Sequence, residues 1–285
     1  MKKYLVIGNP IGHSLSPLIH NYWMKKYRLV DSLYEKRKVE EKDLKNIIKE
    51  IREDKIVGVN VTVPFKKLII PFLDKLDFGA EETQSVNTLV KINEKIVGYN
   101  TDSSGFRDTI REFYPWSNDS KMPLPLEGKC IFILGAGGVA TSIISALKNE
   151  GADNIVLSNR TKEKANELKK LFPELEVIEW GKKPSICDVV INTTSVGLVK
   201  NEELKIDFSD YDKSSNKNLL FYDLIYNPKE TVFLKKAKLR GNKAMNGKMM
   251  FLNQAKYAFH IWTNVLPEID DEVIKLLDWW LKLEF

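Results

Sequence analysis

The chain has 285 residues, about twice the length of a typical domain, so two domains are expected. With 43% hydrophobic and 29% charged residues, it can bury roughly three quarters of its unfolded surface, which excludes disordered, collagen-like and small disulfide-stapled proteins. The 44 basic and 39 acidic residues leave a net charge of +5, which favours an anionic small ligand but is weak evidence for nucleic acid.

Cys130 and Cys187 lie in apolar runs, which favours reduced core thiols over a disulfide, and with three histidines they show no metal-ligand spacing. No apolar run approaches the ~20 residues that cross a bilayer. The short apolar stretch Tyr4–Ile7 ends at Asn9-Pro10, as a buried first strand would and a signal peptide would not. We therefore expect a soluble, cytoplasmic protein with no metal, nucleic-acid or membrane partner.

The first part of the chain alternates short β-rich runs with helical patterns. The expected strands are Tyr4–Ile7, Ile56–Thr62, Val86–Val90 and Ile96–Tyr99, and the expected helices are Leu18–Tyr27 and Leu44–Ile51. Such alternation predicts an α/β fold in which helices cover a mostly parallel sheet.

A second series of strands and helices begins at Lys129. Its expected strands are Cys130–Leu134, Ile155–Leu157, Val177–Ile178, Val189–Ile191 and Leu219–Leu224, and its expected helices are Val139–Asn149 and Lys162–Phe172. The proline-rich stretch 114–125 between the two series predicts a loop next to a domain boundary. We predict one α/β domain of residues 1–104 and a second of residues 105–245.

From Asn246 onward the pattern is helical, and we expect this tail, 246–285, to pack back on the first domain and complete it. Trp262, Trp279 and Trp280 could mark a contact surface, for example in a homodimer, but core packing is the preferred interpretation. The oligomeric state is left open.

The strand expected at Cys130–Leu134 runs into Gly135-Ala136-Gly137-Gly138-Val139-Ala140, which has the spacing Gly-x-Gly-x-x-Ala ahead of a helix. Gly135 permits a tight turn, Gly137 lets the backbone approach a pyrophosphate, and Ala140 allows close packing of helix on strand. A glycine triplet alone is weak evidence. The strand before it and the helix after it favour a dinucleotide site over an ordinary glycine turn.

The next strand leads into Asn159-Arg160-Thr161, where an NAD enzyme would usually place an acid for the ribose 2′-hydroxyl. This chain instead has Arg160, with Lys162 and Lys164 close behind. Because a guanidinium suits a 2′-phosphate, the sequence predicts NADP rather than NAD. The alternative is a solvated basic helix start, which would oppose the helix dipole unless an anion binds there.

Polar residues also gather around the strands of the first domain. In the turn Gly8–Pro17, Ser14 and Ser16 are two apart, so both hydroxyls can face one anionic oxygen group, although helix capping ahead of Pro17 is the simpler interpretation. Further polar residues, which we expect to follow strands and to line a ligand crevice at the strand ends, are Thr62, Lys66, Asn87 and Asp102. For the charged pair among them, a surface ion pair is the alternative.

Taken together, these segments resemble the shikimate dehydrogenase family over nearly the whole chain. The resemblance also rests on Asn192-Thr193-Thr194-Ser195-Val196-Gly197, Asp223-Leu224-Ile225-Tyr226 and Gln254-Ala255. It implies a substrate-binding α/β domain, a Rossmann-type NADP-binding domain, and reduction of 3-dehydroshikimate to shikimate with NADPH in aromatic amino-acid biosynthesis.

The resemblance also implies roles for individual residues. Lys66 and Asp102 match the catalytic pair. The residues matching the substrate shell are Ser14, Ser16, Thr62, Lys66, Asn87, Asp102, Tyr226 and Gln254. Those matching the cofactor shell are Gly135, Ala136, Gly137, Gly138, Val139, Asn159, Arg160, Thr161 and Lys164, with Leu224 and Gly247 near the nicotinamide.

The chain departs from the family pattern at two places. Gln84-Ser85 stands where the family commonly has Gly-Ala, and Met249 stands where it commonly has a second glycine after Gly247. Two other functions remain as alternatives: a quinate/shikimate dehydrogenase with broader substrate or NAD use, and a catalytically inactive ligand-binding regulator.

Overall fold

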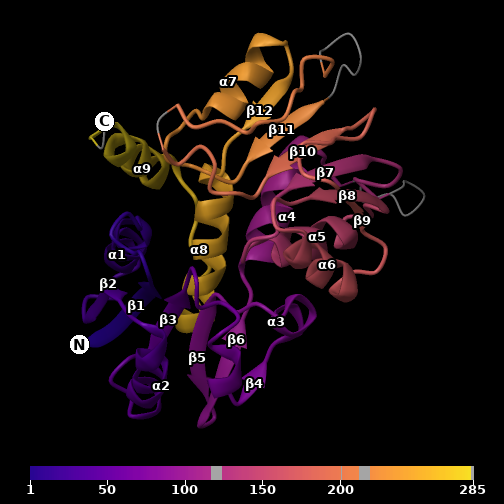
Figure 1. Ribbon diagram of the computed structural model, residues 1–285. Coiled ribbons are helices and arrows are strands. Elements are labelled where there is room, and N and C mark those ends of the chain that lie inside the picture. The colour runs from indigo at the N-terminus through magenta and orange to yellow at the C-terminus, as the bar shows by residue number, and fades with distance from the viewer. Residues whose placement is uncertain (117–123, 200, 212–218, 284–285) are drawn as a thin grey trace. The chain divides into compact units, whose positions relative to one another are not determined.

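Two six-stranded sheets organise the chain, each in its own part of the sequence (Figure 1). The computed structural model describes residues 1–116, 124–199, 201–211 and 219–283. Residues 1–106 and 252–285 form one compact unit, unit 1, and residues 107–251 form another, unit 2. Residues 117–123 of the predicted boundary loop lie outside the described residues.

The sheet of unit 1 has the order β2-β1-β3-β5-β6-β4. Its strands are β1 (Lys2–Gly8), β2 (Ser32–Lys38), β3 (Gly58–Val61), β4 (Lys75–Leu76), β5 (Thr88–Ile92) and β6 (Lys95–Tyr99). The pairs β1–β2, β1–β3 and β4–β6 are parallel, whereas β5 runs antiparallel to both of its neighbours. The predicted α/β sheet is therefore confirmed, with one reversed strand.

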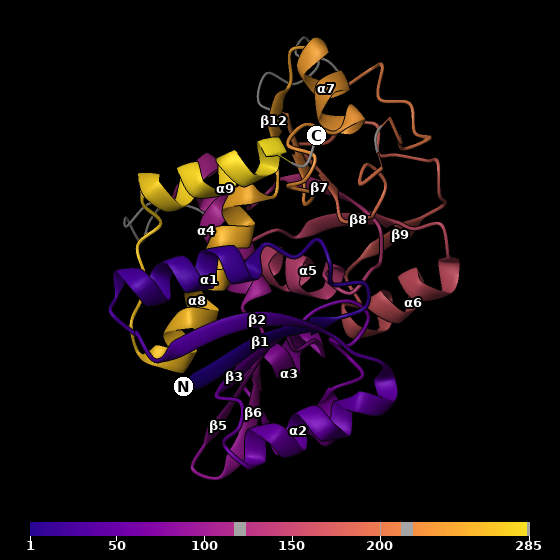
Figure 2. The same ribbon diagram turned by 90° about the vertical axis from the view of Figure 1, so that its left-hand side faces the viewer.

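The helices of unit 1 cover both faces of this sheet. They are α1 (Ser16–Lys26), α2 (Leu44–Arg52), α3 (Phe78–Thr83), the start of α4 (Asp102–Phe113), most of α8 (Lys248–Thr263), and α9 (Asp271–Leu283), with short 3₁₀ turns at Glu41–Asp43 and Ile70–Phe72. Figure 2 shows α2 on one face and α1 on the other. Apolar residues of α2, such as Ile47 and Ile51, pack against Leu5 and Ile7 of β1 in one core cluster.

The opposite face of the sheet carries an aromatic cluster that includes the C-terminal helix α8. Trp262 packs against Tyr4 with ring centroids 5.5 Å apart, and its indole nitrogen donates a 3.0 Å hydrogen bond to the carbonyl of Leu89. Gly58 permits this packing, because a Cβ there would lie 2.4 Å from the Trp262 ring. The prediction that the C-terminal helices pack on the first domain is confirmed.

The sheet of unit 2 is entirely parallel, with the order β12-β11-β10-β7-β8-β9. Its strands are β7 (Cys130–Leu134), β8 (Asn154–Ser158), β9 (Glu176–Ile178), β10 (Val189–Asn192), β11 (Leu220–Asp223) and β12 (Lys243–Met245). The connecting helices include α5 (Ala140–Asn149), α6 (Lys162–Leu171) and α7 (Val232–Leu239). This is the doubly wound strand order of dinucleotide-binding sheets. Successive strands are added on one side of β7 up to β9 and on its other side from β10 onward, so the switch point lies between β7 and β10.

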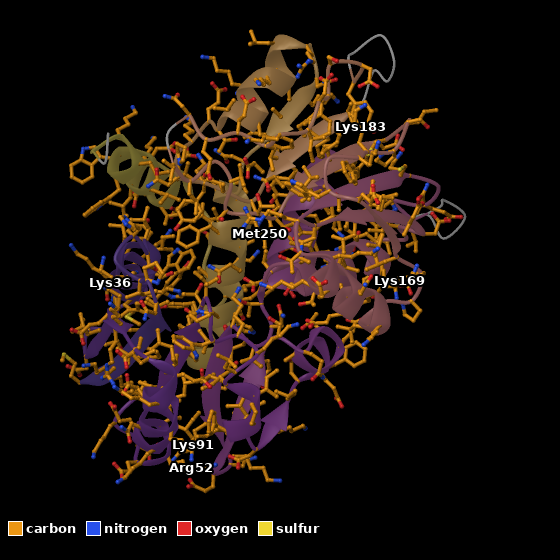
Figure 3. The ribbon with its side chains drawn as sticks, in the orientation of Figure 1. Lys36, Arg52, Lys91, Lys169, Lys183 and Met250 are labelled. Atoms are coloured by element: carbon orange, nitrogen blue, oxygen red, sulfur yellow. The ribbon has the colours of Figure 1, made fainter. Side chains whose placement is uncertain are left out.

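Of the charged side chains labelled in Figure 3, Arg52, Lys91 and Lys183 each form an ion pair. Arg52 pairs with Asp74 at 2.8 Å in unit 1, and Lys183 pairs with Asp210 at 2.7 Å in unit 2. None of the helices described here is both long and apolar enough to span a bilayer.

The tryptophans of the C-terminal helices differ in their burial. Trp262 is only 9% exposed, as predicted for a core residue. Trp279 and Trp280 of α9 are 56% and 38% exposed, so the prediction that they pack in the core is wrong for these two residues. The buried face of α9 carries Val273, Leu277 and Leu281, which are four residues apart. At 100° per residue, Trp279 lies on the opposite side of the helix and Trp280 at the border of the buried face.

Candidate functional site

The predicted site residues of unit 1 gather at one edge of its sheet. Thr62 and Lys66 follow β3, and Asp102 follows β6, as expected. Asn87, however, precedes β5 rather than following a strand, which corrects the sequence interpretation. Because β5 is antiparallel, its first residues lie at the edge where β3 and β6 end. The reversed strand therefore still brings Asn87 to this edge.

Lys66 and Asp102 form an ion pair that is nearly buried on both sides. The Lys66 Nζ lies 2.6 Å from Asp102 Oδ2, and the side chains are 12% and 8% exposed. The predicted alternative, a solvated surface pair, is thus excluded. A buried pair of this kind contributes little to stability compared with apolar packing, so a chemical role has to be considered.

Asp102 is the first residue of α4, and the side chain of Asn100 fixes this end of the helix. The Asn100 side-chain oxygen accepts hydrogen bonds from the backbone N–H groups of Asp102 at 3.0 Å and Ser103 at 3.2 Å, which caps the helix. Gly105, one turn into α4, lets α8 approach, because a Cβ there would lie 2.7 Å from the backbone nitrogen of Gln254. Gln254 is therefore held beside the helix that carries Asp102.

A buried hydrogen-bond network holds Asn87 in place. Its Oδ1 accepts from the Thr101 N–H at 2.8 Å and its Nδ2 donates to Thr101 Oγ1 at 2.9 Å. Asn60 donates to the Asn87 carbonyl at 3.1 Å and accepts from the Tyr34 hydroxyl at 2.6 Å. Burial raises the pKa of Tyr34, so its hydroxyl is a donor at neutral pH.

Sequence reasoning did not select Tyr34, Asn60, Asn100 or Thr101 as site residues. Asn60 lies within the expected strand Ile56–Thr62, and Asn100 and Thr101 lie between the expected strand Ile96–Tyr99 and Asp102. The signal that could have found these three is their polarity at the ends of buried strands. Tyr34 lies on the charged strand β2, which the sequence pattern did not reveal.

The two serines of the N-terminal turn face one another. Ser14 Oγ donates to Ser16 Oγ at 3.3 Å and accepts from the Ser16 backbone N–H at 3.4 Å. Neither serine caps α1, since its N-cap residue is Leu15 and has no side-chain cap. The capping alternative is therefore not supported. Thr62 lies beside this turn, since a Cβ on Gly8 would meet its methyl group at 2.5 Å.

The departure at Gln84-Ser85 has a clear structural meaning. Gln84 has φ 48° and ψ 41°, the left-handed conformation that ends α3, where glycine is ordinarily preferred. Its side chain donates a 2.7 Å hydrogen bond to the carbonyl of Glu81. Ser85 is fully buried, and its carbonyl accepts from Asn100 at 2.9 Å. Gln84 thus adopts the conformation that a glycine would take there.

In unit 2, the glycine loop lies between β7 and α5, beside the point where the strand order reverses. Gly135 has φ +106°, and a Cβ there would clash with Thr193 and Thr194 in the loop after β10. At Gly138 an added Cβ would meet nothing within 4 Å. Val139, the N-cap residue of α5, has no side-chain cap. An open glycine backbone ahead of an uncapped helix fits a bound pyrophosphate.

The predicted 2′-phosphate residues lie at the end of β8. Asn159 ties this segment to the glycine loop, accepting from the Ala136 N–H at 3.0 Å and donating to the Thr161 carbonyl at 2.6 Å. Arg160 and Lys164 are exposed, and Arg160 makes no ion pair with any residue that the structure describes. The donors present fit the 2′-phosphate of NADP.

Three more predicted residues belong to unit 2. Leu224 and Gly247 lie in contact, because a Cβ on Gly247 would be 2.0 Å from the Leu224 carbonyl oxygen. Tyr226 stacks on Phe251 with ring centroids 4.5 Å apart. Tyr226 thus belongs to unit 2, whereas the other substrate-shell residues belong to unit 1. Met249 lies in the first turn of α8 and is half-buried.

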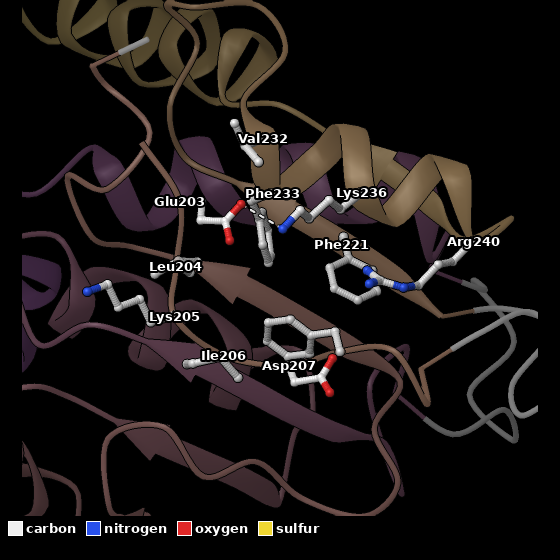
Figure 4. Close-up of a pocket in the computed structure, with 11 residues that line it drawn as sticks. Glu203, Leu204, Lys205, Ile206, Asp207, Phe221, Val232, Phe233, Lys236 and Arg240 are labelled. Atoms are coloured by element: carbon white, nitrogen blue, oxygen red, sulfur yellow. Dashed lines mark hydrogen bonds and ion pairs between the residues drawn. The ribbon is translucent and has the colours of Figure 1, made fainter. Parts of the chain in front are cut away.

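Unit 2 also contains a cavity of about 430 Å³, shown in Figure 4. The segment 203–208, Phe221 of β11 and helix α7 line it. Its charged rim includes an ion pair at 2.6 Å between Lys236 and Glu203. None of the predicted site residues lines this cavity.

The fold and the site define a class of protein. A parallel sheet with a glycine loop at its switch point is a dinucleotide-binding unit, and the other unit carries a buried lysine–aspartate pair among neutral hydroxyl and amide groups. Such an arrangement is typical of a nicotinamide-dependent oxidoreductase acting on a small polar substrate.

Comparison with known proteins identifies the family. Residues 6–89 match the model of the shikimate dehydrogenase substrate binding domain, and residues 119–232 match that of shikimate / quinate 5-dehydrogenase. The chain is 51% identical to the shikimate dehydrogenase (NADP(+)) of Pelagibacter ubique over 97% of this chain and 99% of that one. It therefore belongs to the shikimate dehydrogenase family, as the sequence analysis predicted.

Solved structures agree with this assignment. The shikimate dehydrogenase of Aquifex aeolicus is 36% identical, with a TM-score of 0.85 and 97% of each chain covered. The shikimate 5-dehydrogenase of Thermus thermophilus, solved in complex with NADP(H) and shikimate, is 27% identical, with a TM-score of 0.82 and the whole of both chains covered. The expectation of a Rossmann-type domain is confirmed.

Proposed function

We propose that this chain is an NADP-dependent shikimate dehydrogenase that reversibly reduces 3-dehydroshikimate to shikimate in the shikimate pathway. The observation that carries the proposal is the nearly buried Lys66–Asp102 pair within a chain that is half identical to a relative of that name. In this proposal, residues 1–104 and 246–285 bind the substrate, and residues 105–245 bind NADP.

When bound, NADPH supplies a hydride to the carbonyl carbon. The carbonyl oxygen becomes strongly basic as the hydride is transferred. A cation at that oxygen stabilises the developing negative charge, and a proton donor completes the alcohol. Lys66 can do both. Asp102, at 2.6 Å, orients the ammonium group and can accept a hydrogen bond from a substrate hydroxyl. In the oxidation direction the same lysine takes the proton back.

The remaining substrate residues we assign are uncharged. Ser14 and Ser16, with hydroxyls 3.3 Å apart, suit the two oxygens of a carboxylate, and Tyr226 is assigned with them. Thr62, Asn87 and Gln254 then serve the ring hydroxyls. Neutral donors bind a carboxylate without placing a second positive charge near Lys66, so the lysine stays the single cation at the reacting carbonyl.

For the cofactor, we assign the pyrophosphate to the loop Gly135–Val139 and the 2′-phosphate to Asn159, Arg160, Thr161 and Lys164. Leu224 and Gly247 are assigned to the nicotinamide side. An exposed guanidinium with no ion-pair partner in the described chain supports NADP over NAD. Relatives bearing the name shikimate dehydrogenase (NADP(+)) point the same way.

The two alternatives are less well supported. A quinate/shikimate dehydrogenase with NAD use would not need Arg160, and an inactive regulator would not need a buried Lys66–Asp102 pair. A cytoplasmic location and a homodimer stay predictions.

The direct test is an assay of the purified protein with shikimate and NADP⁺, following NADPH formation, repeated with quinate and with NAD⁺. We expect kcat/KM to be highest for shikimate with NADP⁺. Turnover that favours quinate or NAD⁺ would support the first alternative, and absence of turnover with all four combinations would support the inactive regulator.

The role of Lys66 is tested by a matched pair of variants. Lys66→Met should lower kcat by roughly 10²–10⁴-fold, the usual contribution of general acid–base catalysis. Lys67→Met removes the neighbouring exposed lysine and should leave kcat unchanged. Equal kcat values for the two variants would refute the assignment.

A further inference from the structure

Asp223, the last residue of β11, is fully buried and was not among the predicted site residues. Its carboxylate accepts three hydrogen bonds. Asn192 Nδ2 donates to Oδ1 at 3.0 Å, the backbone N–H of Ile225 donates to Oδ1 at 3.1 Å, and Thr231 Oγ1 donates to Oδ2 at 2.6 Å. These donors come from the end of β10, from the loop after β11 and from the N-cap of α7.

Asn192 extends this connection into the loop after β10. Its Oδ1 accepts from both the N–H of Thr194, at 3.0 Å, and the Thr194 hydroxyl, at 2.7 Å. Its Nδ2 also donates to the Val196 carbonyl at 3.1 Å, and its carbonyl accepts from the Leu224 N–H at 3.1 Å. The loops that follow β10 and β11, which are neighbouring strands, are thereby joined through one pair of side chains (Figure 1).

The same two loops touch the residues assigned to the cofactor. Thr194 lies against Gly135, where a Cβ would be 2.7 Å from the Thr194 methyl group. Leu224 lies against Gly247, and Tyr226 follows two residues later. A shift of the Asp223 carboxylate would therefore be transmitted to the glycine loop assigned to the pyrophosphate and to the residues assigned to the nicotinamide.

Stability alone does not account for a carboxylate here. Burial raises the pKa of Asp223 to about 6, because desolvation of the charged form outweighs the three hydrogen bonds that favour it. Asp223 has no cationic partner among the residues that the structure describes, and such a buried carboxylate costs folding free energy that an uncharged group of similar size would avoid.

We propose that Asp223 is a positioning residue for hydride transfer: it locks the loops 192–197 and 223–226 together so that the nicotinamide and the substrate meet in the reactive geometry. This inference rests on the proposed function. Asp223 itself acts through Asn192, Thr231 and its own loop.

The test compares Asp223→Asn with Asp188→Asn. Asp188 also joins two strands of the same sheet, since its carboxylate accepts a 2.9 Å hydrogen bond from the Cys130 N–H, but it lies at the opposite end of β10. Both variants replace a carboxylate with an amide of the same shape. Turnover is measured with shikimate and NADP⁺ well below the unfolding midpoint of each variant.

We expect Asp223→Asn to lower kcat by about 10–100-fold, because an error of about 1 Å in the reacting geometry costs up to two orders of magnitude, while the KM for NADP⁺ changes little. Asp188→Asn should keep the wild-type kcat. If both variants lose stability but keep kcat, Asp223 is structural and the inference fails. Absence of wild-type turnover would instead overturn the proposed function.

Hydrogen–deuterium exchange of the ligand-free protein gives a readout that does not depend on activity. Amides of residues 193–197 and 224–226 should exchange faster in Asp223→Asn than in wild type or Asp188→Asn. Unchanged exchange in these loops would contradict the inference.

Should Asp223→Asn fail to fold, Thr231→Val and Thr231→Ser replace it. Valine keeps the branched shape but removes the 2.6 Å donor, whereas serine keeps the donor. A lower kcat in Thr231→Val that recovers in Thr231→Ser supports the positioning role of Asp223. Equal kcat values in the two variants contradict it.

Discussion

Arg160 shows at the scale of one residue how a cofactor preference can be written into a sequence. It lies exposed at the end of β8, where an acid would favour NAD. We expect Arg160→Ala to weaken NADP⁺ binding by about 1.5–3 kcal/mol per lost charged hydrogen bond and to leave NAD⁺ binding nearly unchanged. Titration calorimetry with both cofactors measures this difference.

Lys169→Ala provides the control for Arg160, since Lys169 is an exposed cation near the other end of α6 (Figure 3). It should affect neither cofactor. If Arg160→Ala weakens both cofactors equally, the arginine supports the loop rather than the 2′-phosphate.

Gly247 is a residue whose lack of a side chain is required by its neighbour. A Cβ there would lie 2.0 Å from the Leu224 carbonyl oxygen, so the backbone must move to admit it. We expect Gly247→Ala to lower the free energy of unfolding by about 1–3 kcal/mol, the usual cost of overpacking. Urea denaturation measures the change.

Gly79→Ala is the matched substitution for Gly247. An added Cβ at Gly79 would come no closer than 3.5 Å to any neighbour, and Gly79 lies within α3. Alanine there should be neutral or slightly stabilising, because it favours the helix. Equal losses at the two positions would show that the Leu224 contact is not the cause.

At the scale of elements, strands with continuous apolar runs were predictable and strands without them were not. The five predicted strands of unit 2 match β7 to β11. Four of them, β7, β8, β10 and β11, are apolar and buried almost throughout, whereas β9 is a short edge strand that Val177 and Ile178 marked in the sequence. β2, with the sequence Ser-Leu-Tyr-Glu-Lys-Arg-Lys, is an edge strand whose charges disguise it. β2 is held in the sheet by pairing with β1, and a pairing with a distant strand cannot be predicted from the local sequence pattern.

The aromatic cluster between α1, β2 and α8 contains a buried histidine, His20, whose protonation makes stability depend on pH. Its ring stacks on Tyr34 with centroids 4.3 Å apart, and within the described structure neither ring nitrogen has a hydrogen-bond partner. Complete burial lowers its pKa to about 3. Between pH 6.5 and 3 the unfolded chain binds a proton at this histidine and the folded chain does not, so stability falls as the pH falls through this window.

From pH 6.5 to 4 the loss attributable to His20 is roughly 3 kcal/mol, at 1.36 kcal/mol per pH unit. We expect His20→Phe to lose less stability over this interval than wild type, whatever its stability at neutral pH. Urea unfolding at several pH values gives the comparison. His13→Phe, at an exposed histidine, should retain the wild-type pH dependence. Parallel pH profiles for wild type and His20→Phe would rule out His20 as the source.

At the scale of the whole molecule, the residues assigned to catalysis were easier to predict from the sequence than the buried polar residues that position the site. Lys66 and Asp102 could be selected because residues that follow apolar strands line the ligand crevice of such a sheet, and because both match the catalytic pair of the family. Asn100, Asn60 and Asp223 could not, because an asparagine or aspartate at a strand end is common and its role is defined by partners 15 to 31 residues away. Such partners become neighbours only when the sheets form.

Unit 1 is built from two separate stretches of the chain, residues 1–106 and 252–285. This arrangement predicts how the molecule should respond to a substitution in the core that the two stretches share. The ring contacts of Trp262, its hydrogen bond to Leu89 and the close approach of Gly58 all lie within unit 1. Trp262→Ala should therefore lower the stability of unit 1 by about 3–5 kcal/mol. In native-state hydrogen exchange, protection of β1 and β3 should fall by much more than that of β7 and β10. Trp279→Ala, at a tryptophan that is 56% exposed, should leave both units within about 0.5 kcal/mol of wild type. An equal loss of protection in all four strands after Trp262→Ala would mean that the two units unfold as one, and that the aromatic cluster stabilises the whole chain rather than the unit in which it lies.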